Sequence, residues 1–126
     1  MKALNIVETA YRATLEEQDD PVVWITHAMK GAGADLTVLL RGNAVNYAVA
    51  AQGAPPLVFG ARTQKNAPRL AEAVAGLIGK GIEVYAIRED MVERGLDDET
   101  LIDGLIAIRR AEMPSLFESH DQVWHW

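Results

Sequence analysis

ALNIV at residues 3–7, PVVWITHAMKG at 21–31 and DLTVLLR at 35–41 are the segments that decide the fold of this chain. The first and last are short apolar runs, as buried parallel strands are. Between them, Asp20 can cap a helix that has Pro21 at its first position. Strand, helix and strand within about 40 residues form a βαβ unit, whose two strands lie parallel. The sequence therefore predicts an α/β fold.

The rest of the chain continues this alternation, and the helix over 21–31 should face inward with Val22, Ile25, Ala28 and Met29. We expect one domain over residues 1–126, a three-layer α/β/α sandwich around about five mostly parallel strands. The further elements expected are a loop over 11–20, a helix over 42–51, a loop over 52–66, a helix over 67–79 capped by Asn66, a strand over 82–87, a helical turn over 91–94, a short helix over 97–102, a strand over 105–108, a helix over 110–119 interrupted near Pro114, and a strand over 122–126.

Composition excludes several classes of function. The net charge of −6 disfavours nucleic-acid binding, and no apolar run is long enough to span a membrane. The first residues lack the apolar block of a signal peptide, so we expect a cytoplasmic protein. The chain has no cysteine, which removes thiolate chemistry and thiolate metal sites. Its three histidines lack metal-ligand spacing, and we expect neither a metal nor a cofactor.

Charged residues follow the strand over 82–87 at the edge where open α/β sheets place their sites. Arg88, Glu89 and Asp90 could form a polar pocket there, with Asp90 or Glu89 as an acid, a base or a ligand anchor. They could equally be a solvated helix start, because acidic residues favour the first turn of a helix. Asn43, after Gly42, could help to bind an anion or could lie in an ordinary helix cap.

A second cluster of polar residues lies in the long loop over 52–66. Arg62 and Lys65, close to the flexible Gly60, could close over a carboxylate, a phosphate or a sulfur oxyanion. The alternatives are a solvent-facing loop and a contact between subunits. At the end of the chain, Trp124 and Trp126 should lie on one face of a strand, buried in a subunit interface or at the far end of the core.

In its order of elements the chain resembles the DsrE/DsrF-like family of small sulfur-transfer proteins, which includes the DsrEFH and TusBCD complexes. The most specific matches are ADLTVLLRGNAV at 34–45, KGIEVYAIREDMVERGL at 80–96 with Arg94-Gly95 near its end, and LIDG at 101–104. The resemblance covers nearly the whole chain. It implies the DsrEFH-like fold and a homo-oligomer, a trimer or a hexamer.

The chain departs from this family at the residue that carries sulfur. Counting back from Arg94-Gly95, Ile87 stands at the persulfide cysteine, and Asp90 at the second cysteine of some members. We therefore expect a non-catalytic protein that binds a small ligand or a protein partner, in a sulfur-related pathway, without persulfide transfer. The alternative is an enzyme that uses Asp90, Glu89 or Arg62 instead of a thiol. The residues of the expected ligand pocket are Asn43, Arg62, Lys65, Ile87, Arg88, Glu89 and Asp90.

Overall fold

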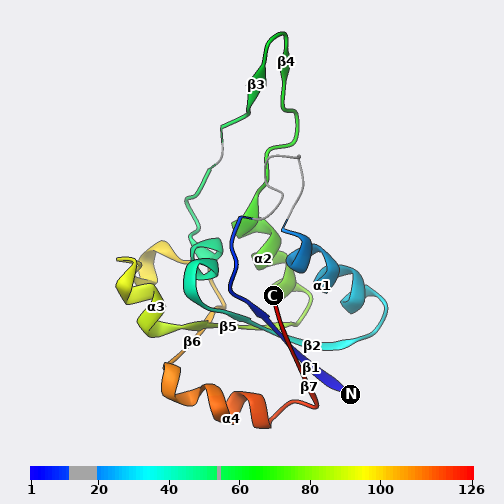
Figure 1. Ribbon diagram of the computed structural model, residues 1–126, viewed down its shortest axis with the longest axis vertical. Helices are drawn as coiled ribbons and strands as arrows, with labels where there is room; N and C mark the ends of the chain where they lie inside the picture. Colours follow the sequence, from blue (N-terminus) through cyan, green and yellow to red (C-terminus); the bar gives the residue numbers. More distant parts are fainter. Residues whose placement is uncertain (12–19, 54) are drawn as a thin grey trace.

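Five strands form one parallel sheet in the computed structural model, which describes residues 1–11, 20–53 and 55–126 (Figure 1). Their order is β6-β5-β2-β1-β7, and every neighbouring pair is parallel. The prediction of a sheet of about five mostly parallel strands is confirmed. The strands are β1 (Lys2–Val7), β2 (Asp35–Leu40), β5 (Glu83–Ile87), β6 (Ile106–Ile108) and β7 (Gln122–His125).

Helices cover both faces of this sheet, as the three-layer prediction required. Helices α1 (Pro21–Gly31) and α2 (Leu70–Gly79) lie on one face, and α4 (Met113–Glu118) lies on the other (Figure 1). Helix α3 (Arg88–Glu93) follows β5 directly. In the described part of the chain, no helix is long and apolar enough to cross a membrane.

Side chains of β1 point alternately to the two faces of the sheet, and the core accordingly forms two clusters. Val7 belongs to the larger cluster, beneath α1 and α2, whereas Leu4 and Ile6 belong to the smaller one, which Met113 of α4 covers. Side chains of successive strand residues point to opposite faces, so a strand in a three-layer fold is apolar on both. This is why β1 and β2 appear in the sequence as continuous apolar runs.

Helix α1 begins as the sequence predicted. The Asp20 carboxylate accepts hydrogen bonds from the Val22 and Val23 amides at 2.8 and 3.2 Å, and the Tyr47 hydroxyl donates to it at 2.6 Å. Burial, and then the bond to Asp20, hold the pKa of Tyr47 above its ordinary value. Tyr47 therefore stays protonated and remains a donor, which fixes the start of α1 to the segment after β2.

The inward face of α1 differs from the predicted face. Of the four residues expected inside, Val22 alone is buried; Ile25 and Met29 are half-buried and Ala28 is exposed. A neighbouring row of residues meets the sheet instead, and a buried hydrogen bond of 2.9 Å joins Thr26 to Asn5 of β1. The residues that α1 buries are Val22, Val23 and Thr26.

The segment after β2 also departs from the prediction. The helix expected over 42–51 is a 3-10 helix, η2, that spans Gly42–Ala48. Gly42 has a φ of +55°, and a Cβ there would lie 3.3 Å from Cγ of Glu8. The residue must therefore take a left-handed conformation in a crowded place, which only glycine does at low cost.

The expected loop over 52–66 contains a hairpin that stands out from the sheet (Figure 1). Strand β3 (Val58–Phe59) pairs with β4 (Arg62–Thr63), and Gly60 opens the turn with a φ of +59°. Two-residue hairpin turns need positive φ, which glycine provides. The proline and glycine content of the segment concealed these strands, each of which is too short to show a period.

Other boundaries differ as well. Helix α2 begins at Leu70, with Arg69 and not Asn66 as its cap, and the turn expected over 91–94 is a helix that starts at Arg88. The short helix expected over 97–102 is a 3-10 helix, η3 (Asp98–Thr100). The interruption near Pro114 is confirmed, because 3-10 helix η4 (Arg110–Glu112) precedes α4. Most of the loop expected over 11–20 lies outside the described residues.

Replacement of Asp20 by alanine should lower the free energy of unfolding by about 2–4 kcal/mol, because the helix loses its cap and the buried Tyr47 hydroxyl loses its acceptor. Asp20→Asn keeps an acceptor oxygen at the same place and should cost less than half as much. Urea unfolding followed by circular dichroism measures both variants. Equal losses in the two would contradict the hydrogen-bonding account.

Candidate functional site

Asp90 lies where the carboxyl ends of three neighbouring strands meet. It is 7% exposed, in the first turn of α3 after β5. One of its oxygens accepts the Gly42 amide, after β2, at 2.7 Å, and the other pairs with the Arg110 guanidinium, after β6, at 2.5 Å. A single carboxylate thus joins the segments that follow β2, β5 and β6.

Further bonds around Asp90 use the neighbouring polar groups. Arg94 donates to the main-chain oxygen of Asp90 at 3.0 Å and to the side-chain oxygen of Asn43 at 2.8 and 3.2 Å. The Glu89 carboxylate accepts the amide of Arg110 at 2.8 Å. Of the expected pocket, Asn43, Glu89 and Asp90 are therefore brought together, and each of the three is already bonded within the protein.

The electrostatics of this cluster keep Asp90 ionised. Burial by itself raises the pKa of its carboxyl group, but the Gly42 amide and the adjacent Arg110 outweigh burial and hold the pKa below the ordinary value. A carboxylate with donors on both oxygens is a poor proton donor or acceptor near neutral pH. The arrangement supports an anchor that connects chain segments, and it gives no support to acid–base catalysis.

The other expected pocket residues lie elsewhere. Ile87 has no exposed surface and belongs to the smaller core cluster beneath α4. Arg88 is exposed at the start of α3. Arg62 is exposed in the β3–β4 hairpin, which projects away from the α3 end of the sheet (Figure 1). Lys65, just after the hairpin, lines a separate hollow.

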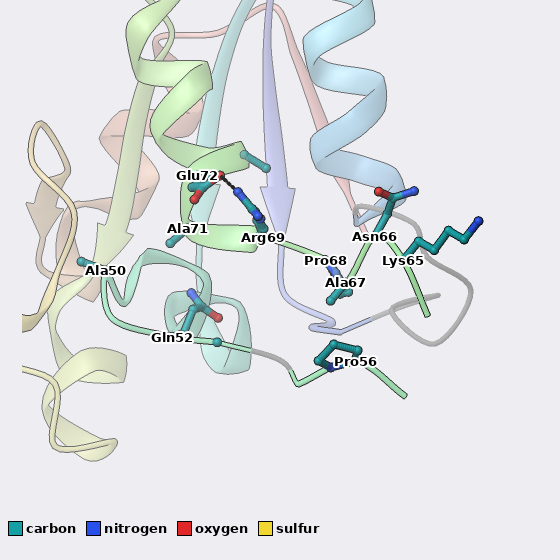
Figure 2. A pocket seen from close by; sticks show the side chains of 12 residues that line it. Ala50, Gln52, Pro56, Lys65, Asn66, Ala67, Pro68, Arg69, Ala71 and Glu72 are labelled. Carbon is teal, nitrogen blue, oxygen red and sulfur yellow. Dashed lines mark ion pairs between the residues drawn. The ribbon is translucent and has the colours of Figure 1, made fainter. Parts of the chain in front are cut away.

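This hollow has a volume of about 840 Å³ and lies between the base of the hairpin and the start of α2 (Figure 2). Its size falls within the range of small-ligand sites, roughly 300–1,000 Å³. Figure 2 shows Lys65 and Asn66 on one side of it and the Arg69–Glu72 ion pair on another. Its lining residues are Ala50, Gln52, Gly53, Pro56, Lys65, Asn66, Ala67, Pro68, Arg69, Ala71, Glu72 and Ala73.

The start of α2 gives this hollow a positive character. Among the described residues, no side chain caps the helix, whose N-cap is Arg69. Uncapped amides at a helix N-terminus attract anions, and the cations Lys65 and Arg69 add to this effect. Glu72 opposes it, with its carboxylate 3.5 Å from Arg69. Arg69 and the helix end thus lie beside one carboxylate, whereas the Lys65 side chain extends away from that ion pair (Figure 2).

A further charged cluster lies at the ends of β1, β2 and β7. Glu8 pairs with His125 at 2.5 Å and with Arg41 at 3.8 Å. Its members are partly exposed, and His125 also lines a small apolar groove together with Trp124 and Trp126. In the described part of the chain, no three histidine or acidic side chains are grouped as a metal ion requires.

Sequence reasoning missed Arg69, Arg94 and Arg110, and the reasons differ. Arg110 follows β6 as Asp90 follows β5, but the pairing of β5 with β6 was unknown before the strand order. Arg94 was singled out only for the family motif, although it lies four residues after Asp90 and so on the same side of a helix. Arg69 was expected in the first turn of a helix over 67–79, whereas it precedes the helix.

Replacement of Asp90 by asparagine should lower the free energy of unfolding at pH 7 by about 1.5–3 kcal/mol, the value of a hydrogen-bonded charge. Because the folded-state pKa is depressed, the wild type gains this stability above the unfolded pKa of about 4 and loses it as the pH falls through the folded pKa. The free energies of unfolding of the wild type and of Asp90→Asn should therefore become more similar in acid. Urea unfolding from pH 7 into acid tests the prediction, and Asp103→Asn, at an exposed position, is the matched control. A difference in unfolding free energy between wild type and Asp90→Asn that stays the same across this range would refute it.

No model of a known protein family and no curated protein sequence matches this chain. Solved structures do match it, over 99–100% of its length and 95–100% of theirs. The ychN protein of E. coli is 20% identical with a TM-score of 0.70. Proteins MTH1491 of Methanobacterium thermoautotrophicum (9%, TM-score 0.67) and BT1422 of Bacteroides thetaiotaomicron (12%, TM-score 0.69) are both described as of unknown function. The chain thus shares its α/β fold, end to end, with small proteins from bacteria and an archaeon.

Proposed function

We propose that this chain is a DsrE/DsrF-like protein that binds a small anionic ligand in the hollow beside α2 and does not transfer sulfur. The observation that carries the proposal is that Lys65 and Arg69 both line the hollow at the start of α2, a helix end that no side chain of the described residues caps. The family assignment is supported by the order of the sequence motifs and by structural neighbours that cover the whole chain.

Two features argue against persulfide transfer. The chain has no cysteine, and the thioether of methionine is no substitute for a thiolate nucleophile. Ile87, at the position of the family's sulfur-carrying residue, is closed off from solvent by the core beneath α4. Both the reactive atom and access to its position are therefore missing.

The alternative of a non-thiol enzyme has less support. The residues proposed for it were Asp90, Glu89 and Arg62. The first two are hydrogen-bonded to other segments of the chain, and Arg62 projects from the hairpin. Catalysis by a nucleophile or a general base requires partners positioned around a shared space. These residues do not share one, so binding is the function that we favour.

The chemistry of the hollow defines the class of ligand. A carboxylate, a phosphate or a sulfur oxyanion could accept hydrogen bonds from the α2 amides and from Lys65 and Arg69. An apolar ligand would find few partners among Gln52, Asn66 and Glu72. A ligand that also carries a donor, such as a hydroxyl or an amine, could use the Glu72 carboxylate as well.

Isothermal titration with phosphate, sulfate, thiosulfate and acetate tests this proposal. We expect at least one of these anions to bind, and Arg69→Ala to weaken that binding about tenfold, which corresponds to roughly 1.4 kcal/mol. Arg88→Ala is the matched control, because it removes the same charge from an exposed site on α3. Equal weakening by both variants would mean nonspecific attraction, and no binding by any probe would reject the anion site.

Incubation with a sulfur donor tests the absence of transfer separately. We expect intact-protein mass spectrometry to show no stable adduct of one sulfur atom, because the chain offers no thiolate to hold it. A DsrE-like protein that does carry a cysteine is the positive control. A stable sulfur adduct on this chain would overturn the claim, whatever the anion titrations show.

A further inference from the structure

We propose that a second copy of this chain docks on the outer edge of β7, so that two β7 strands pair antiparallel about a two-fold axis at Trp124. The two sheets would then form one continuous sheet with α1 of both copies on the same face. This edge is distinct from the anion hollow, which lies beside the start of α2.

The backbone of β7 presents unpaired hydrogen-bonding groups on its outer side. Trp126 donates its amide to Ile6 at 3.0 Å and accepts the Glu8 amide at 3.1 Å, so it is bonded to β1. Alternate residues of a strand bond to the same neighbour, which places Trp124 inward as well. The N–H and C=O groups of Val123 and His125 therefore point away from β1, where the described sheet has no further strand.

Apolar side chains border this open edge. Trp124 and Trp126 line one apolar groove of about 480 Å³ together with His125 and with Ile25 and Met29 of α1. The Trp126 ring nitrogen donates to Asn5 at 3.3 Å. Trp126 is still 44% exposed. A gathering of large apolar side chains on a surface marks an interaction site.

Among the described residues, this edge also lacks the features that keep sheet edges from pairing. In natural proteins, a lysine, a proline, a bulge or a covering segment prevents an edge strand from pairing with another chain. Strand β7 reads QVWH, has no proline or lysine, and pairs in an unbroken register with β1. The opposite edge strand, β6, is shorter, with the three residues Ile106–Ile108. Strand β7 is thus the better template for another strand.

A second β7 fits this edge in one register. With the axis at Trp124, the outward groups of Val123 face those of His125 in the other copy and form hydrogen-bonded pairs on both sides of the axis. Trp124 meets its own counterpart, and Trp126 lies opposite Gln122. No like charges oppose each other within the paired strands, and the apolar groove of each copy is extended by the groove of the other.

Sedimentation of the full chain at micromolar concentration tests the contact. We expect the wild type and Val123→Ala to sediment as a dimer or a multiple of one. Val123→Pro should reduce the mass to half or less, because proline removes the outward N–H and leaves the bonds to β1 intact. A monomeric wild type, or an assembly that Val123→Pro leaves unchanged, would overturn the proposal.

Cross-linking gives a second measurement that does not depend on the proline variant. Opposed residues in a non-hydrogen-bonded antiparallel pair have Cα atoms about 4.5 Å apart, within disulfide range. Since the chain has no native cysteine, Trp124→Cys should form a disulfide-linked dimer under mild oxidation. Phe59→Cys, exposed on the hairpin, should not. Equal cross-linking of the two, or none at residue 124, would refute the two-fold contact.

Discussion

The buried carboxylate of Asp90 is the interaction on which the carboxyl edge of this sheet depends. A charge removed from water must be paired and hydrogen-bonded, and Asp90 meets this need with an amide after β2 and a guanidinium after β6. Three chain segments far apart in the sequence are held by these bonds. An edge that open α/β sheets generally use for chemistry is occupied here by structural contacts, and the hollow at the start of α2 lies elsewhere.

The position that the resemblance assigns to a sulfur-carrying cysteine lies inside the core. Ile87 packs in the cluster of Leu4, Ile6, Leu39 and Met113, so α4 covers the position that the resemblance assigns to sulfur chemistry. A cysteine placed there would be buried among apolar groups, which raise the pKa of a thiol and suppress its reactivity. Replacement of Ile87 by cysteine alone would therefore not place an accessible thiol at this position, because α4 covers it.

The elements that could be predicted from the sequence are those with local causes. Asp20-Pro21 begins α1 because a cap and a fixed φ act within one turn, and β1 and β2 are recognisable because both of their faces are buried. The pairing of Asp90 with Arg110 could not be predicted, since it depends on β5 and β6 being neighbours. The hairpin and η2 depend on positive φ at Gly60 and Gly42, and the sequence does not show which glycines take it.

Helix α1 shows most clearly why a periodic pattern can mislead. The residues Ile25, Ala28 and Met29 have helical spacing, but the row that meets the sheet includes Thr26, which is satisfied by Asn5. A helix that is apolar on two sides does not reveal from its pattern which side is the core. Such a helix is expected when both sides have a neighbour. One neighbour of α1 is its own sheet, and its outer row borders the groove beside β7. The error in the predicted face and the apolar groove therefore have one physical origin, a helix with more apolar surface than one sheet can cover.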